Sequence, residues 1–174
     1  MTPTITNRRL LLVDDNAAIH EDFQRLLAPP DGGSRALDDE AVAIFGWKIA
    51  APAATLAKDR FELDSALQGQ EALKKVQQAC AEGRPYALAF VDMRMPPGWD
   101  GLTTIQKIWE ADPALQIVIC TAYSDRSWIE VQDALPERTR WLVLKKPFDK
   151  VELLQIAHVL VHKWELEQAE RGGD

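Results

Sequence analysis

The stretch "AFVDMRMPPGWDG" (residues 89–101) runs from apolar residues to one acidic residue and then into a Pro-Pro-Gly turn. The apolar residues from position 86 onward predict a buried strand that ends at Asp92. A carboxylate at the tip of a buried strand is costly unless other groups stabilise its charge. The rest of the chain must therefore supply partners for Asp92.

The composition of the 174-residue chain favours one globular domain, because 47% of its residues are hydrophobic. Its formal net charge of -7 and the lack of a basic stripe argue against a nucleic-acid surface. The sequence contains neither an apolar run of membrane-spanning length nor the apolar core of a signal peptide. We expect a cytoplasmic protein that binds no membrane. Apolar patterns around Cys80 and Cys120 favour two buried thiols over a disulfide.

Predicted strands and helices alternate along the chain. The strands are expected over residues 8–15, 60–66, 86–92, 115–122 and 141–146. Helices are expected over 16–27 and 68–80, before Asp112-Pro113, before Pro136, and from Asp149 to about Ala169. This alternation requires crossover connections and a parallel sheet. We therefore predict an α/β fold with a doubly wound five-stranded sheet, whose site lies at the carboxyl ends of the strands.

Two segments lie outside this alternating pattern. Residues 28–59 separate the first helix from the second strand, and a structureless loop of that length is rare inside a compact domain. We predict a small helical insert there. Residues 165–174 are polar and charge-mixed, so both a frayed tail and the start of a signalling helix or coiled-coil seam stay open.

Polar residues follow four of the five predicted strands, and the fold would gather them at one edge of the sheet. They are Asp14, Asp15, Asp92, Thr121 and Lys146. Three carboxylates at one edge repel one another unless a proton or a cation relieves the repulsion. Oxygen ligands at a partly solvated edge suit Mg²⁺. We predict direct ligation by Asp15, Asp92 and the backbone carbonyl of Arg94, with Asp14 binding directly or through a metal-bound water.

A carboxylate beside Mg²⁺ and a lysine is suited to accept a phosphoryl group as an aspartyl phosphate. Asp92 would be the acceptor, and Lys146 would neutralise charge on the phosphoryl group. The Thr121 hydroxyl and the backbone amides of Met93 and Ala122 are predicted to bind the remaining phosphoryl oxygens. The peptide bond before Pro147 can be cis at small cost, and a cis bond would aim Lys146 across the strand ends.

Four pieces of sequence stand in one order, each at a predicted strand end: "LLLVDDN", "AFVDMRMPPGWDG", "ICTAYSD" and "VLKKPFD". Together they resemble the receiver domain of bacterial two-component response regulators. The resemblance covers about residues 8–164, apart from the long insert. It implies a flavodoxin-like sheet of strand order 2-1-3-4-5 and a receiver domain over residues 1–164.

The resemblance also implies a role for each gathered residue. Asp92 would take a phosphoryl group from the phosphohistidine of a histidine kinase or phosphotransfer protein. Asp14 and Asp15 would be the acidic pair that holds Mg²⁺. Thr121 would be the switch hydroxyl, and Lys146 the lysine typical of the family. Phosphorylation would shift the fourth helix, fifth strand and fifth helix, which would bind an output domain or protein partner, or a second copy as a homodimer.

Besides the long insert, three positions depart from the family pattern. Val143 stands where the family usually has an aromatic residue, and Trp141 lies two residues earlier on the same face of the strand. Arg94 and Tyr123 stand where side chains flank the path of the hydrolytic water. Our hypothesis is that these two bulky side chains slow loss of the phosphoryl group.

Two other functions compete with the phosphoacceptor. A haloacid-dehalogenase-type phosphatase needs a second acid two residues after its nucleophile, and Arg94 stands there instead. We therefore expect a protein that is not an enzyme acting on external substrates. The second alternative is a pseudo-receiver that binds partners without phosphorylation, which the missing aromatic at Val143 keeps open.

Overall fold

The computed structural model describes residues 7–28, 60–122 and 128–173. The predicted insert from residue 29 onward and Tyr123 lie outside these described residues.

Within the described residues, five parallel strands form one sheet in the order β2-β1-β3-β4-β5. They are β1 (Arg9–Val13), β2 (Glu62–Ala66), β3 (Leu88–Asp92), β4 (Gln116–Thr121) and β5 (Trp141–Lys145). The predicted strand order is confirmed. Each strand lies inside its predicted range and is shorter at one or both ends, because terminal residues with apolar side chains need not join the hydrogen-bonded ladder.

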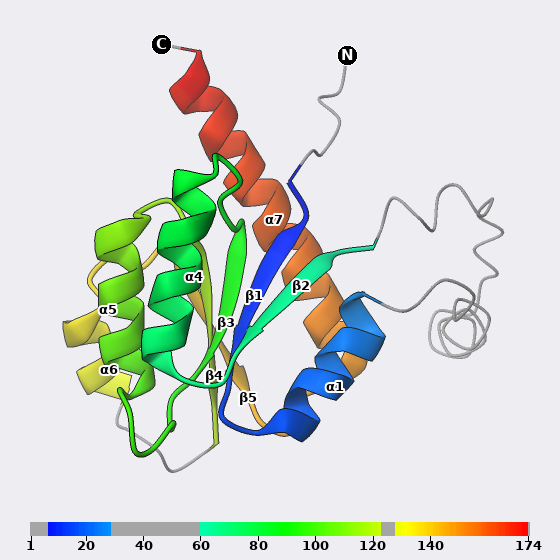
Figure 1. Ribbon diagram of the computed structural model, residues 1–174, viewed down its shortest axis with the longest axis vertical. Helices are drawn as coiled ribbons and strands as arrows, with labels where there is room; N and C mark the ends of the chain where they lie inside the picture. Colours follow the sequence, from blue (N-terminus) through cyan, green and yellow to red (C-terminus); the bar gives the residue numbers. More distant parts are fainter. Residues whose placement is uncertain (1–6, 29–59, 123–127, 174) are drawn as a thin grey trace, which may run out of the picture.

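Helices cover both faces of the sheet (Figure 1). On one face lie α1 (Ala17–Leu27) and α7 (Lys150–Gly172), and on the other lie α4 (Gly69–Ala81), α5 (Gly101–Ala111) and α6 (Trp128–Ala134). The fourth and fifth helices of the sequence prediction correspond to α6 and α7. Since both faces are covered, the central strands are apolar without alternation.

Alternate residues of the central strands enter two separate cores. Leu11, Val13, Ala89 and Val91 pack toward α4 and α5. Leu10, Leu12, Leu88 and Phe90 pack toward α1 and α7. The period of two in a strand sends neighbours to opposite faces, so one apolar run supplies both cores.

Side chains at the helix starts set where the helices begin. The side chain of Asn16 accepts a hydrogen bond from the amide of Ala18, and that of Asp149 accepts one from Val151. The last helix, α7, continues to Gly172 without a break, so residues 165–172 are helical. No described helix is long and apolar enough to cross a membrane.

Both cysteines are free, as predicted, but only one of them is buried. Cys120 lies inside the sheet, whereas Cys80 is exposed at the last turn of α4. The prediction of two buried thiols is therefore wrong for Cys80. Ala79, one residue earlier, occupies the buried position, and a step of one residue turns a helical side chain away from the core.

Candidate functional site

The carboxyl ends of β1, β3, β4 and β5 bring the predicted site residues together. Asp14 and Asp15 follow β1, Asp92 ends β3, Thr121 ends β4 and Lys146 follows β5. The register sets Asp92 opposite Cys120 and Thr121 opposite Lys145, so the strand tips lie level. Neighbouring parallel strands thus place residues far apart in sequence at one edge.

Lys146 bridges two of the three acids. Its Nζ lies 3.0 Å from Oδ2 of Asp14 and 3.3 Å from Oδ1 of Asp92. The Lys146-Pro147 peptide bond is cis, the isomer that was expected to aim the lysine across the strand ends. A lysine from the last strand therefore provides the charge partner that the buried carboxylate of Asp92 needs.

Each polar group of Asp14 has a partner, and the residue is 1% exposed. Its amide donates to the carbonyl of Ala66 over 3.1 Å. Its Oδ1 accepts from the amide of Asn16 at 2.9 Å, and its Oδ2 accepts from Lys146 at 3.0 Å. Its carbonyl oxygen lies 2.6 Å from Nε2 of His20. Asp15, in contrast, is exposed. The acidic pair is thus divided into one fully bonded residue and one facing solvent.

The three carboxylates fit a divalent cation. One oxygen from each of Asp14, Asp15 and Asp92 lies within 4.8 Å of the other two. Among the described residues this is the single group of three or more His, Cys, Asp or Glu side chains arranged this way. Carboxylate oxygens at a partly solvated edge are ligands that Mg²⁺ accepts. The residues present therefore fit Mg²⁺ by ligand type and clustering.

The charges of this cluster shift two pKa values. Burial, and then the charge of Asp14, raise the pKa of Asp92 above its ordinary value, although Lys146 and the amide of Arg94 act in the opposite direction. Burial lowers the pKa of Lys146, but Asp14 and then Asp92 outweigh burial, so this pKa is raised. With three acids and one ammonium group, the cluster favours an additional positive charge.

The two backbone amides that follow Asp92 have different partners. The amide of Met93 donates to the carbonyl of Cys120 over 3.2 Å, and its predicted role at a phosphoryl oxygen stays a prediction. The amide of Arg94 instead hydrogen-bonds the Asp92 carboxylate. The cause is the ladder between β3 and β4, which continues one residue past Asp92 and uses the Met93 amide.

The hydroxyl of Thr121 donates to the carbonyl oxygen of Ala122 over 2.9 Å. Thr121 is half-buried and Ala122 exposed, both at the tip of β4. The roles predicted for the Thr121 hydroxyl and the Ala122 amide stay predictions. The same holds for the carbonyl of Arg94 as a metal ligand and for the bulky side chains of Arg94, which is exposed, and Tyr123.

The structure shows where Val143, which replaces the aromatic residue usual in the family, and Trp141 lie on β5. Val143 is half-buried in the middle of β5 and packs against the core on the face of the sheet that α4, α5 and α6 cover. Trp141 lies at the start of β5, where its Nε1 donates to the carbonyl of Leu135 over 3.1 Å. Trp141 pairs with Ile117, at the end of β4 far from Thr121, so its ring does not replace the missing aromatic.

His20 was not among the predicted site residues. Its contact to the Asp14 carbonyl joins α1 to the loop that carries the acidic pair. The sequence offers one signal for it, since His20 stands five residues after Asp15, on the first turns of the predicted helix. That spacing alone does not distinguish a buried ring from a solvated one.

Comparison with known proteins identifies relatives of this chain. The family of response regulator receiver domains matches residues 37–158. The oxygen regulatory protein NreC of Staphylococcus haemolyticus (strain JCSC1435) is 31% identical over 122 residues, which is 70% of this chain and 52% of that protein. NreC of Staphylococcus carnosus (strain TM300) is 35% identical over 92 residues, 53% of this chain and 39% of that protein. The matched part of this chain thus spans about half or less of the length of these two relatives.

Solved structures share the fold. A CheY-like response regulator receiver domain protein from Methanospirillum hungatei JF-1 superposes with a TM-score of 0.62 at 18% identity, over 93% of this chain and 99% of that one. A structure described as adenylate cyclase from Rhodopirellula baltica gives 0.67 at 21% identity, over 96% of each chain. The family match covers residues 37–158, and the observed strand order is the one expected of a receiver domain. This chain therefore belongs to the response regulator receiver domain family.

Proposed function

We propose that this receiver domain is a phosphoacceptor switch in which Asp92 takes a phosphoryl group from the phosphohistidine of a histidine kinase or phosphotransfer protein. Membership of the family implies a phosphoacceptor signalling role. The observation that carries the choice of Asp92 is its contact with Lys146, 3.3 Å away, inside a group of three carboxylates. A nucleophile, a fixed positive charge and a metal-binding group thereby stand at one strand tip.

The transfer needs little from the protein except position and charge. A carboxylate oxygen of Asp92 forms the new bond to phosphorus while the N–P bond breaks, and its electron pair leaves with the imidazole nitrogen. The ammonium of Lys146 offsets charge on the phosphoryl oxygens, and the Arg94 amide can donate to one of them. Bound Mg²⁺ would supply further positive charge at these oxygens.

The product would not be released as in a phosphatase of external substrates. A haloacid-dehalogenase-type phosphatase, which also forms an aspartyl phosphate, needs an acid two residues after its nucleophile, and Arg94 stands there with an exposed side chain. The aspartyl phosphate would therefore persist until water reaches it. We propose a signalling role for this chain rather than an enzymatic one.

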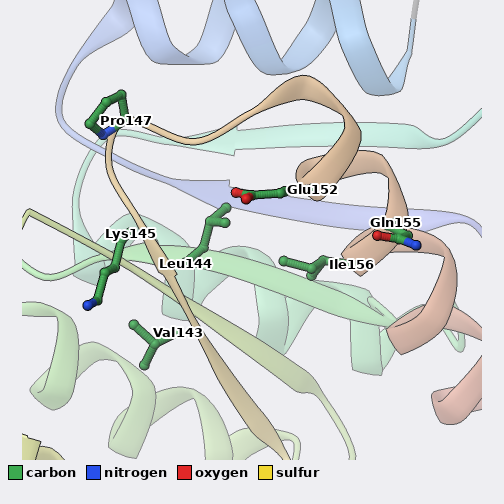
Figure 2. Close-up of a pocket in the computed structure, with 7 residues that line it drawn as sticks. All are labelled: Val143, Leu144, Lys145, Pro147, Glu152, Gln155 and Ile156. Atoms are coloured by element: carbon green, nitrogen blue, oxygen red, sulfur yellow. The ribbon is translucent and has the colours of Figure 1, made fainter. Parts of the chain in front are cut away.

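We propose that the output partner binds at β5 and the first turns of α7. A hollow of about 480 Å³ lies there between the strand and the helix (Figure 2). Apolar Val143 and Ile156 and polar Glu152 and Gln155 line it. The hollow lies on the last strand, and Lys146 directly follows that strand, which supports this surface as the one that responds to the site.

Incubation with a phosphohistidine donor in the presence of Mg²⁺ tests the function. Wild type should acquire a hydroxylamine-labile phosphoryl group, and Asp92→Asn should acquire none. Asp133→Asn, which changes an exposed acid on α6, should behave as wild type. Absence of uptake by folded wild type would favour the pseudo-receiver.

A further inference from the structure

We propose that His20 is a positioning residue for the magnesium-binding acids, and that it acts through the peptide bond between Asp14 and Asp15. The inference rests on the proposed function and adds a residue on α1 to the site. Its starting observation is the distance of 2.6 Å between Nε2 of His20 and the carbonyl oxygen of Asp14. The contact spans six residues and leads from the first turns of α1 back to the loop.

The chemistry of the contact defines which nitrogen carries a proton. A carbonyl oxygen only accepts, so Nε2 of His20 must donate to Asp14. The other ring nitrogen, Nδ1, is buried and has no hydrogen-bond partner among the described residues. Within the described part of the chain, the bond to Asp14 is therefore the polar contact that orients this half-buried ring.

The contact restrains Asp15 more than Asp14. The carbonyl of Asp14 and the amide of Asp15 belong to one planar peptide unit, so holding the carbonyl also sets the direction in which the chain enters Asp15. The carboxylate of Asp14 is already held by Asn16 and Lys146, independently of His20. Asp15 is exposed, and because its side chain has no polar partner within the described part of the chain, its backbone sets its orientation there. His20 thus supports the acid that has the fewest restraints.

Groups behind the ligands matter for metal binding because they fix ligand orientation in advance. Loss of such a supporting hydrogen bond typically weakens metal affinity by about 10–100-fold. A histidine that merely fills space under α1 would instead lower thermal stability and leave the affinity for Mg²⁺ unchanged. The two roles therefore differ in a quantity that is measurable without any phosphodonor.

Titration calorimetry of the full chain with Mg²⁺ alone tests the proposal. His20→Leu keeps the helix and the volume but removes the donor, and we expect its Kd for Mg²⁺ to rise about tenfold. His20→Gln carries an amide nitrogen that can take the place of Nε2, and should restore most of the affinity. His162→Leu, at a mostly exposed histidine on α7, is the matched control and should bind as wild type.

A double-mutant cycle with Asp15→Asn tests the route. If His20 acts through Asp15, His20→Leu should add little to the weakening already caused by Asp15→Asn. Simple addition of the two effects would overturn the proposal, as would unchanged Mg²⁺ affinity in folded His20→Leu or an absence of Mg²⁺ binding by wild type. Should His20→Leu not fold, His20→Asn replaces it, since its shorter amide does not reach the carbonyl.

The phosphotransfer assay separates this inference from the proposed function. A wild type that binds Mg²⁺ in a His20-dependent way but takes up no phosphoryl group would refute the function and support the positioning role. Phosphoryl uptake with no effect of His20→Leu on Mg²⁺ affinity would support the proposed function and refute the positioning role of His20.

Discussion

Asp92 carries a charge that its surroundings only partly stabilise. Its side chain is buried at the tip of β3, with the carboxylate of Asp14 nearby and Lys146 at 3.3 Å. Burial and the charge of Asp14 raise its pKa, and the opposing contacts do not cancel these two causes. The acceptor is thus a residue where function and stability conflict, and a metal-free protein should show the conflict.

We expect Asp92→Asn to unfold at a higher temperature than wild type at neutral pH in EDTA. The pKa of Asp92 is raised in the folded state, so the folded state binds its proton more tightly than the unfolded state. Stability from this group therefore falls as pH rises from the ordinary value of 3.8 through the raised folded value. The rise in melting temperature caused by Asp92→Asn should grow over that pH window. It should amount to about 2–4 °C for each kcal/mol of destabilisation from burial and repulsion that the substitution removes.

Thermal melts of both proteins at several pH values check this expectation. Asp133→Asn on α6 controls for the loss of an exposed acid. A variant that melts below wild type at neutral pH would mean that the attraction of Lys146 outweighs burial and the charge of Asp14.

The helices α4 and α5 pack closely against each other near the loop that follows Asp92. Gly69 is the first residue of α4, and a Cβ built there would lie 2.2 Å from Oγ1 of Thr104 on α5. It would also lie 3.2 Å from the ring of Trp99. Thr104 is fully buried, and its hydroxyl donates to the carbonyl of Asp100 over 2.8 Å. The close approach of α4 and α5 therefore depends on glycine at position 69.

We expect Gly69→Ala to lower the free energy of unfolding by about 1–3 kcal/mol, because neither the buried threonine nor the tryptophan can move without disturbing its own packing. Chemical denaturation measures this loss. The double variant with Thr104→Ala removes the clashing oxygen and should recover part of it. Gly172→Ala is the matched control, since a Cβ there meets nothing within 4 Å. Equal stability of Gly69→Ala and wild type would show that α4 and α5 separate easily.

At the scale of the molecule, the two ends of the sheet have different roles. The carboxyl ends of the strands carry the site, and the opposite end is hydrogen-bonded to α7. Gln116, the first residue of β4, is 0% exposed. Its Nε2 donates to Glu167 at 3.0 Å, and its Oε1 accepts from Lys163 at 2.9 Å. Lys163 and Glu167 also form an ion pair of 3.2 Å on α7. The same strand thus carries the site at Thr121 and holds the far end of α7 at Gln116.

We expect truncation after residue 164 to destabilise the domain and spare phosphoryl uptake. The truncation removes Glu167, so the buried amide of Gln116 loses a partner at a cost of about 1–3 kcal/mol. Truncation after residue 171 keeps the contact and is the control. Melting temperatures and the phosphotransfer assay measure the two effects. Equal melting temperatures of the two truncated proteins would mean that residues 165–171 do not stabilise the domain. They would then be the frayed tail, one of the two alternatives that the sequence allowed.

The sequence by itself predicted a doubly wound parallel sheet and the edge of that sheet at which the site residues meet. Apolar runs ending in Asp14 and Asp92, separated by amphipathic helices, are local patterns, and parallel crossovers allow few arrangements of them. The resemblance to receiver domains then assigned the strand order that the structure shows. Asp14, Asp92 and Lys146 meet as expected because a strand end is a position that the chain itself marks.

Only the tertiary structure decided which atoms make the contacts. The amide of Arg94 rather than Met93 meets the acceptor because β4 uses the Met93 amide. His20 turns inward to Asp14 because α1 packs close to the loop after β1. Cys80 is exposed because α4 buries Ala79 instead. Each of these outcomes depends on the direction in which one group points and on the space and hydrogen-bonding groups that a neighbouring element provides. Residue type and spacing in the sequence do not contain this information.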